Sequence, residues 1–255
     1  MDQAKEGRAH CPPFQPIDRA DGFCGRNRFL HLANRLCVGD DTIYHPTERS
    51  MHRPKFSDES RWSLLADDGD PFAIAADPAV LGAIRRPTVA LSIWTRPPPL
   101  SIEPAGLTGF TPIRIETGIS TARAALARTF AVSPKRAWHL PLISDVTELA
   151  ARFAALMDLD DVDIRIERVT GNSCWKFHAD YVRARLITTY CGRGTEWAVR
   201  DGETLGETRR MEAGDVSIFK GRIWLPDPPV LHRSPPIAQT EEVRLLLVID
   251  PLPKC

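Results

Sequence analysis

A histidine and an aspartate stand two residues apart in the middle of residues 176–181, and a second histidine follows much later. His178 and Asp180 share one face if this stretch is a strand, because residues i and i+2 of a strand point the same way. His232 ends another predicted strand and reaches the same place in a rolled-up sheet. Two imidazoles and one carboxylate on one side of a metal form a 2-His-1-carboxylate triad, which suits Fe(II) and leaves coordination positions open.

A single arginine lies at a position that could serve this site. Arg244 opens the apolar run 244–249, and an arginine fork there can bind a carboxylate. Regular strand alternation from His178 also predicts that Thr188 and Tyr190 point into the site and donate hydrogen bonds to a bound acid.

Two alternatives to an iron site stay open. In the first, His178 and Asp180 form a structural hydrogen bond, and Arg244 pairs with Glu242 or Asp250. In the second, Cys174, which has the parity of His178, adds a thiolate and favours Zn(II). Since the six cysteines form no Cys-X-X-Cys pair, reduced and mostly buried thiols are expected.

The elements that must position these residues follow from the periodicity of the sequence. Apolar residues at helical spacing predict helices over 121–130 and 145–157, the second with Asp145 as its N-cap, after a short capped helix over 77–87 and a strand over 88–94. Alternation at a period of two predicts strands over 162–167, 177–190, 197–199, 216–219, 230–232 and 243–249.

This order of elements indicates an α+β fold, an antiparallel double-stranded β-helix of the cupin or jelly-roll type with a helical layer packed on it. We expect three regions. Residues 1–60 form an irregular or partly disordered extension, residues 61–160 a mixed region whose helices support the sheet, and residues 161–255 the β-helix core with the metal site.

The amino-acid composition of the chain limits the classes of molecule that it is expected to bind. Lys plus Arg and Asp plus Glu number 33 each, so no broad positive field favours nucleic acid or an anionic membrane. No apolar run approaches the length of a membrane span or a secretory signal. We therefore expect a cytoplasmic protein with a small-molecule or protein substrate and neither a nucleic-acid nor a membrane partner.

The set His178-X-Asp180, His232 and Arg244 resembles the Fe(II)- and 2-oxoglutarate-dependent dioxygenases. The resemblance implies that the two histidines and the aspartate bind Fe(II), and that Arg244 holds the distal carboxylate of 2-oxoglutarate. The expected function is hydroxylation of an unidentified substrate.

A longer stretch, residues 177–197, together with Lys220-Gly221 and residues 231–236, resembles a bacterial family known as domain of unknown function 1826. The resemblance covers roughly residues 70 to 252 and implies a link to zinc homeostasis. A cupin-like zinc-binding protein without oxygenase activity is therefore the alternative function. A binding module with purely structural His and Asp side chains is a third.

Overall fold

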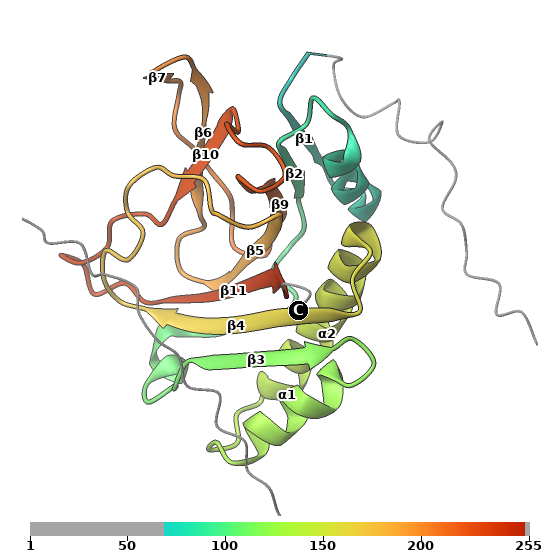
Figure 1. The fold of residues 1–255 in the computed structure, drawn as a ribbon. Coiled ribbons are helices and arrows are strands. Elements are labelled where there is room, and N and C mark those ends of the chain that lie inside the picture. Colours follow the sequence, from blue (N-terminus) through green and yellow to red (C-terminus); the bar gives the residue numbers. More distant parts are fainter. Residues whose placement is uncertain (1–68, 253–255) are drawn as a thin grey trace, which may run out of the picture. The chain divides into compact units, whose positions relative to one another are not determined.

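Strands dominate the second half of the chain, where β-branched and aliphatic residues alternate with polar ones. The computed structural model describes residues 69–252 and places these strands in two sheets (Figure 1). The seven-stranded sheet has the order β1-β2-β9-β5-β11-β4-β3. Its strands are β1 (Phe72–Ala75), β2 (Leu91–Trp94), β3 (Ile113–Gly118), β4 (Asp161–Val169), β5 (Ala184–Cys191), β9 (Val216–Lys220) and β11 (Arg244–Pro251).

The smaller sheet has the order β10-β6-β7, with β8 also paired to β6. Its strands are β6 (Glu196–Asp201), β7 (Thr204–Leu205), β8 (Arg209–Arg210) and β10 (Val230–Arg233). A single backbone bridge between His178 and His232 adds one more position beside β10.

From residue 161 onward the strands pair in a nested order, the first with the last and then successively inward. The first strand, β4, pairs with the last, β11; the bridge at His178 pairs with β10; β5 pairs with β9; and β6 pairs with β8. All four pairings are antiparallel, and successive partners alternate between the two sheets. This nested pairing is the double-stranded β-helix of cupins and jelly rolls, so the predicted fold class is confirmed.

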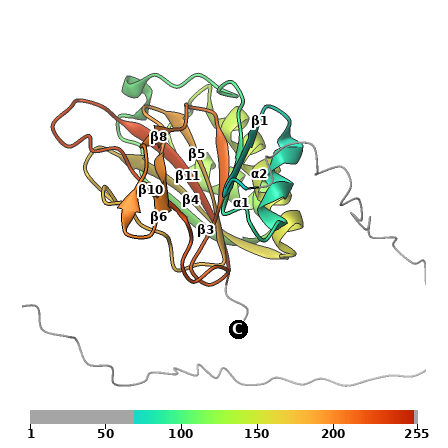
Figure 2. The same cartoon turned by 90° about the horizontal axis from the view of Figure 1, so that it is seen from above.

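The seven-stranded sheet separates two cores. One face packs against α1 (Ala122–Ala131) and α2 (His139–Met157), which lie along one side of the sheet in Figures 1 and 2. The other face carries Ile187, Phe219 and Val248 and packs against Trp197 and Val230 of the smaller sheet. Residues next to each other on β5 therefore face different cores, as the pleat of a strand requires.

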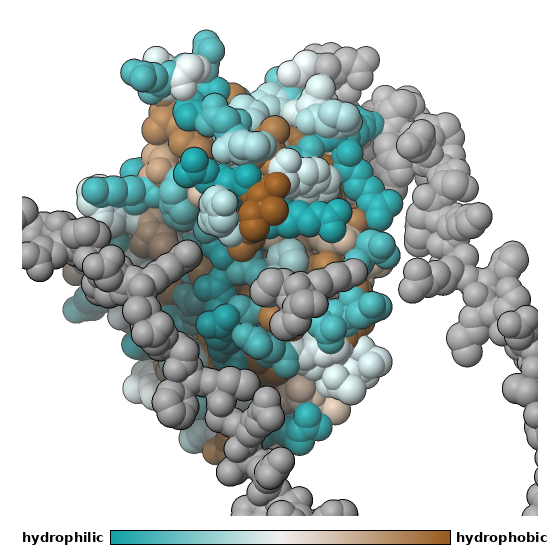
Figure 3. Space-filling view, in the orientation of Figure 1, coloured by the Kyte–Doolittle hydropathy of each residue, from teal (hydrophilic) through white to brown (hydrophobic). Residues whose placement is uncertain are grey.

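Two short 3₁₀ helices, η2 (Pro78–Arg85) and η3 (Pro104–Leu107), complete the described elements. Asp77 caps η2, as its position before proline predicts, with a side-chain oxygen that accepts from Ala79 N at 2.8 Å. On the face drawn in Figure 3, hydrophilic residues cover most of the described surface and hydrophobic ones form small patches. No helix among residues 69–252 is long and apolar enough to cross a membrane.

Two predictions about the elements need correction. The strand predicted over 177–190 begins only at residue 184, and residues 177–183 are irregular apart from the His178 bridge. Asp145 does not cap α2, which begins six residues earlier, at His139. The nested pairing begins at β4, and the earlier strands β1, β2 and β3 extend the sheet at both edges. The extension expected over residues 1–60 lies outside the described residues.

Candidate metal centre

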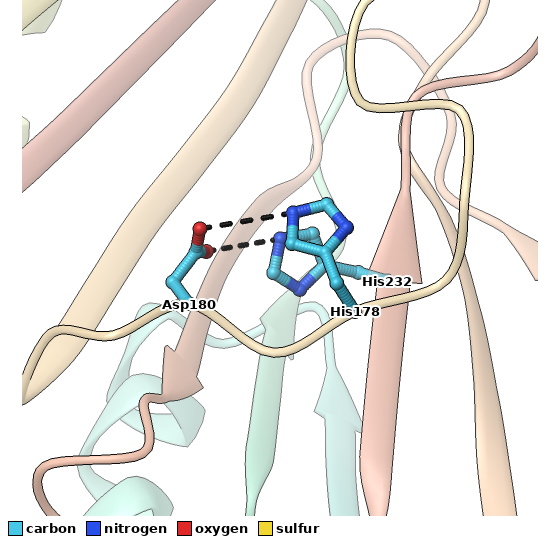
Figure 4. Close-up of side chains that lie close together, drawn as sticks. All are labelled: His178, Asp180 and His232. Carbon is cyan, nitrogen blue, oxygen red and sulfur yellow. Dashed lines mark ion pairs between the residues drawn. The ribbon is translucent and has the colours of Figure 1, made fainter. Parts of the chain in front are cut away.

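His178, Asp180 and His232 meet at one point of the fold, as Figure 4 shows. One ligand atom from each residue lies within 4.8 Å of the others. Nε2 of His232 is 3.1 Å from Oδ2 of Asp180, and Nε2 of His178 is 3.7 Å from Oδ1. Among the described residues this is the cluster able to hold a metal ion, and it contains no cysteine. The site with Cys174 that was left open does not form, because Cys174 is exposed outside the cluster.

Backbone contacts bring the three ligands together although they are far apart in sequence. His178 and His232 exchange a pair of N–H···O bonds, each 3.0 Å long. Arg222 N donates to the Asp180 carbonyl at 2.8 Å, and Gly221 N donates to the Arg183 carbonyl at 2.9 Å. The irregular segment 177–183 is thus held between β10 and the end of β9.

The histidine rings are prepared to act as ligands. Nδ1 of His178 lies 2.8 Å from the Lys176 carbonyl, and donation to that oxygen leaves a lone pair on Nε2. His232 is 5% exposed and packs against Phe219, with 4.4 Å between ring centroids. Burial lowers the pKa of His232, against the opposing effect of Asp180, so its imidazole is neutral at physiological pH. The side chain of His178 is 34% exposed, which leaves one side of the cluster accessible to solvent.

Asp180 is oriented by a second layer of charges. Arg185 donates to its Oδ1 atom and binds Asp250 through two hydrogen bonds, both 2.7 Å long. Burial alone would raise the pKa of Asp180. The nearby imidazole of His232, whose Nε2 is 3.1 Å from Oδ2, and the charges of Arg185 and His178 outweigh burial and lower this pKa to about 2.

The other carboxylate oxygen of Asp180 lacks a hydrogen-bond donor, which indicates that it binds a cation. Oδ2 is buried and has no hydrogen bond of acceptable geometry, although Nε2 of His232 lies near it. A buried charged oxygen without a donor costs free energy unless a cation compensates it. The donor set of two imidazoles and an ionised carboxylate therefore fits a divalent transition metal.

Arg244 lies at the start of β11 and is fully buried. Its guanidinium donates to the Arg193 carbonyl at 2.6 Å and to Ser234 Oγ at 2.9 Å, with two longer contacts to the hydroxyls of Thr189 and Thr195. Burial lowers its pKa to about 10. Among the described residues no carboxylate forms an ion pair with it.

The structural alternative for Arg244 is therefore not found. Glu242 pairs with Arg193 at 2.6 Å, and Asp250 pairs with Arg165 and Arg185 at 2.7 Å each. The charge of Arg244 is compensated only by neutral oxygens and by more distant carboxylates.

The structure does not bring Thr188 and Tyr190 to this site. Tyr190 packs in the helix-side core, where its hydroxyl donates to Asp145 of α2 at 2.6 Å. Thr188 pairs with Leu247, a residue of the same core, and its buried hydroxyl has no partner. The parity prediction was wrong because the alternation does not run unbroken from residue 178 into β5.

Odd-numbered residues of β5 face the site instead. Arg185 contacts Asp180, and Thr189 contacts Arg244. Sequence reasoning also missed Ser234, which lies two residues after His232 and directly follows β10. Two residues of an extended chain that are two apart point to the same side.

Comparison with known proteins identifies the family to which the chain is similar. A family described as "Protein of unknown function (DUF1826)" matches residues 75–250. No curated protein matches the chain.

Several solved structures share a weak likeness of fold. A dioxygenase for auxin oxidation from rice is 16% identical, with a TM-score of 0.35 over 55% of this chain and 56% of that one. The dioxygenase for auxin oxidation 1 of Arabidopsis thaliana, in a binary complex with 2-oxoglutarate, is 14% identical, with a TM-score of 0.36 over 56% and 64%. A Pseudomonas putida prolyl-4-hydroxylase is 14% identical, with a TM-score of 0.31 over 59% and 97%. The chain thus spans less than two thirds of either plant enzyme, and the fold assignment rests on the strand pairing above.

Proposed function

The chain belongs to the DUF1826 family, and from this premise we propose that it is an Fe(II)- and 2-oxoglutarate-dependent oxygenase acting on an unidentified substrate. One observation carries the proposal. A partly buried His-Asp-His cluster with an unsatisfied carboxylate oxygen is linked, through residues 232–234, to a fully buried arginine that has no carboxylate partner among residues 69–252. The first feature fits a metal cation, and the second fits an anion.

The two features are joined through β10. Ser234, which accepts from Arg244, follows His232 by two residues, so the backbone rises about 6–7 Å between them. A short dicarboxylate can span such a distance, with one end at the metal and the other at the guanidinium. 2-Oxoglutarate is a co-substrate of this length.

His178, Asp180 and His232 would hold the metal on one side and leave the other positions open. Fe(II) bound there would supply the activation of O₂ that couples oxidative decarboxylation of 2-oxoglutarate to oxidation of the substrate. Arg244 would bind the distal carboxylate, and the hydroxyls of Ser234, Thr189 and Thr195 would orient the guanidinium. Arg185 and Asp250 keep the Asp180 carboxylate ionised and oriented.

Zinc binding without oxygenase activity uses the same three ligands but gives Arg244 no role. The two functions therefore differ in what they require of this arginine. The decisive experiment is an anaerobic titration of metal-free protein with Fe(II) and then 2-oxoglutarate, following the visible charge-transfer absorption of the chelate.

We expect this absorption in the unmodified protein and its loss in Arg244→Ala, with Fe(II) binding retained. Arg244→Lys keeps the charge but loses the fork, so we expect 2-oxoglutarate affinity to fall about 10- to 100-fold. Arg200→Ala, which removes a half-exposed arginine paired with Asp227, is the matched control and should bind normally. Tight Zn(II) binding without any chelate absorption in the Fe(II) protein would overturn the oxygenase and favour zinc handling.

A further inference from the structure

We propose that the protein has a second ligand site, remote from the metal cluster, that binds a small planar aromatic acid. The site is a cavity of about 520 Å³ between residues 106–114, which lead into β3, and the connection from α1 to α2. A volume of this size is typical of pockets for small organic ligands. The proposal does not depend on the oxygenase function.

One wall of the cavity is aromatic. Phe110 and Trp138 both line it, with 5.9 Å between their ring centroids. Phe130 lies behind them, 6.4 Å from Trp138 in an edge-to-face contact that fixes the indole. Rings held in this way offer flat apolar surface against which a planar ligand stacks at little cost in side-chain entropy.

The other wall is cationic. Two arginines, Arg114 and Arg136, line the cavity, and no aspartate or glutamate does. Arg114 is paired with Asp163 at 3.0 Å, whereas Arg136 forms no ion pair among the described residues. His139 is the first residue of α2, so the positive end of the helix dipole also faces this region. A carboxylate is the group that complements such a lining.

His139 points most directly to a ligand. It is only 8% exposed and lines the cavity, and its ring centroid lies 4.6 Å from Phe130 and 4.4 Å from Trp138. Its ring nitrogens stay accessible to solvent and form no hydrogen bond within residues 69–252. Burial, together with the charge of Arg136, lowers the pKa of His139, so the ring is neutral. A neutral imidazole carries one N–H donor, which a carboxylate oxygen in the cavity can accept from.

The cavity and the metal cluster lie on opposite faces of the seven-stranded sheet. Phe110, Phe130 and Trp138 pack in the helix-side core, whereas His232 stacks on Phe219 of the inter-sheet core. In Figure 1, β3 and α1 lie at the lower end of the fold and β10 at the upper end. Binding at one site can therefore be measured without occupying the other.

The test is calorimetric titration of the metal-free protein with 1-naphthoate, with 1-naphthalenemethanol as the uncharged analogue. We expect saturable binding of one naphthoate per chain and at least about tenfold weaker binding of the alcohol. Arg136→Ala should weaken naphthoate binding about tenfold. Arg128→Ala, which removes an exposed arginine of α1 that does not line the cavity, should leave binding unchanged.

Ser133→Trp tests the position of the ligand, because Ser133 is half-buried at the lining and an indole there would fill the space. We expect it to abolish naphthoate binding while the thermal unfolding temperature stays within a few degrees. The site would be overturned if Arg136→Ala and Ser133→Trp both bound naphthoate with the affinity of the unmodified protein. Loss of binding in Arg244→Ala would also overturn it, since the ligand would then occupy the metal side of the sheet.

Discussion

At the scale of single residues, the candidate centre depends on the groups that hold its ligands as much as on the ligands. Asp180 lies in an irregular segment, so no strand geometry fixes its carboxylate. Arg185 fixes it instead, and Asp250 on β11 fixes Arg185 with two hydrogen bonds. The position of one candidate metal ligand, Asp180, is thus set by β11, a strand to which this residue does not belong.

Asp250→Asn should weaken metal binding about 10- to 100-fold, the usual cost of removing an outer partner of a ligand. Without the charge of Asp250, Arg185 is free to pair fully with Asp180 and to compete with the metal. Anaerobic Fe(II) titration measures the change. Asp227→Asn removes an exposed carboxylate that pairs with Arg200, and it should bind Fe(II) normally. Equal affinities in the two variants would show that Asp250 does not support the site.

Burial of Lys220 makes the free energy of unfolding depend on pH. Its ammonium is buried and donates to the Arg86 carbonyl at 2.6 Å, and burial lowers its pKa from 10.5 to about 8. Between pH 8 and 10.5 the unfolded chain holds this proton while the folded chain has lost it, so stability rises with pH. In denaturant melts, this rise should exceed that of Lys220→Met by about 1–3 kcal/mol. Parallel pH profiles of the two proteins would contradict the assignment.

At the scale of elements, most strands and helices were predictable because their signals are local. The alternation of Val162, Ile164 and Ile166 with charged residues placed β4 correctly, and the apolar stripe of residues 146–157 placed most of α2. The start of α2 was missed because Asp145 looks like an N-cap. In the fold it is a buried partner of Arg96, at 2.6 Å, and of Tyr190.

The site was predictable in its ligands but not in its surroundings. The types and order of His178, Asp180 and His232 were enough to predict that the three side chains lie close together, whatever the backbone does between them. The faces of Thr188 and Tyr190 depend on where a strand begins, and a break of a few residues reverses the parity. That break is produced by tertiary contacts with residues 221–223, which no local pattern reveals.

Gly221 is the point at which the end of β9 approaches the ligand segment. A Cβ atom there would overlap the Val182 carbonyl and lie 3.0 Å from the Asp180 carbonyl. Gly221→Ala should lower the free energy of unfolding by about 2–3 kcal/mol and weaken metal binding, because segment 180–183 must move. Chemical denaturation and Fe(II) titration measure both effects. Gly171→Ala, where a Cβ meets nothing within 4 Å, should change neither.

At the scale of the whole molecule, a metal in the cluster would link the segment before β5 to β10, which are separated by most of the β-helix. Metal binding should therefore stabilise the fold as a unit. At a metal concentration 100-fold above the dissociation constant the gain is about 2.7 kcal/mol, or a rise of about 5–10 °C in unfolding temperature. Scanning calorimetry with and without metal measures this rise, and a chelator should reverse it. The His232→Ala variant, which lacks one of the proposed ligands, should have the same unfolding temperature with and without metal.

The nested pairing of strands also has a consequence for how the chain is made. β11 lies in the middle of the seven-stranded sheet, hydrogen-bonded to both β4 and β5, yet it is the last of these strands to be synthesised. Until it leaves the ribosome, β4 and β5 each keep an open edge able to pair with another chain. Arg244 enters with the same strand, so the proposed anion-binding residue and the closed sheet form in one late step. Vectorial synthesis therefore exposes this fold to aggregation until its final strand is in place.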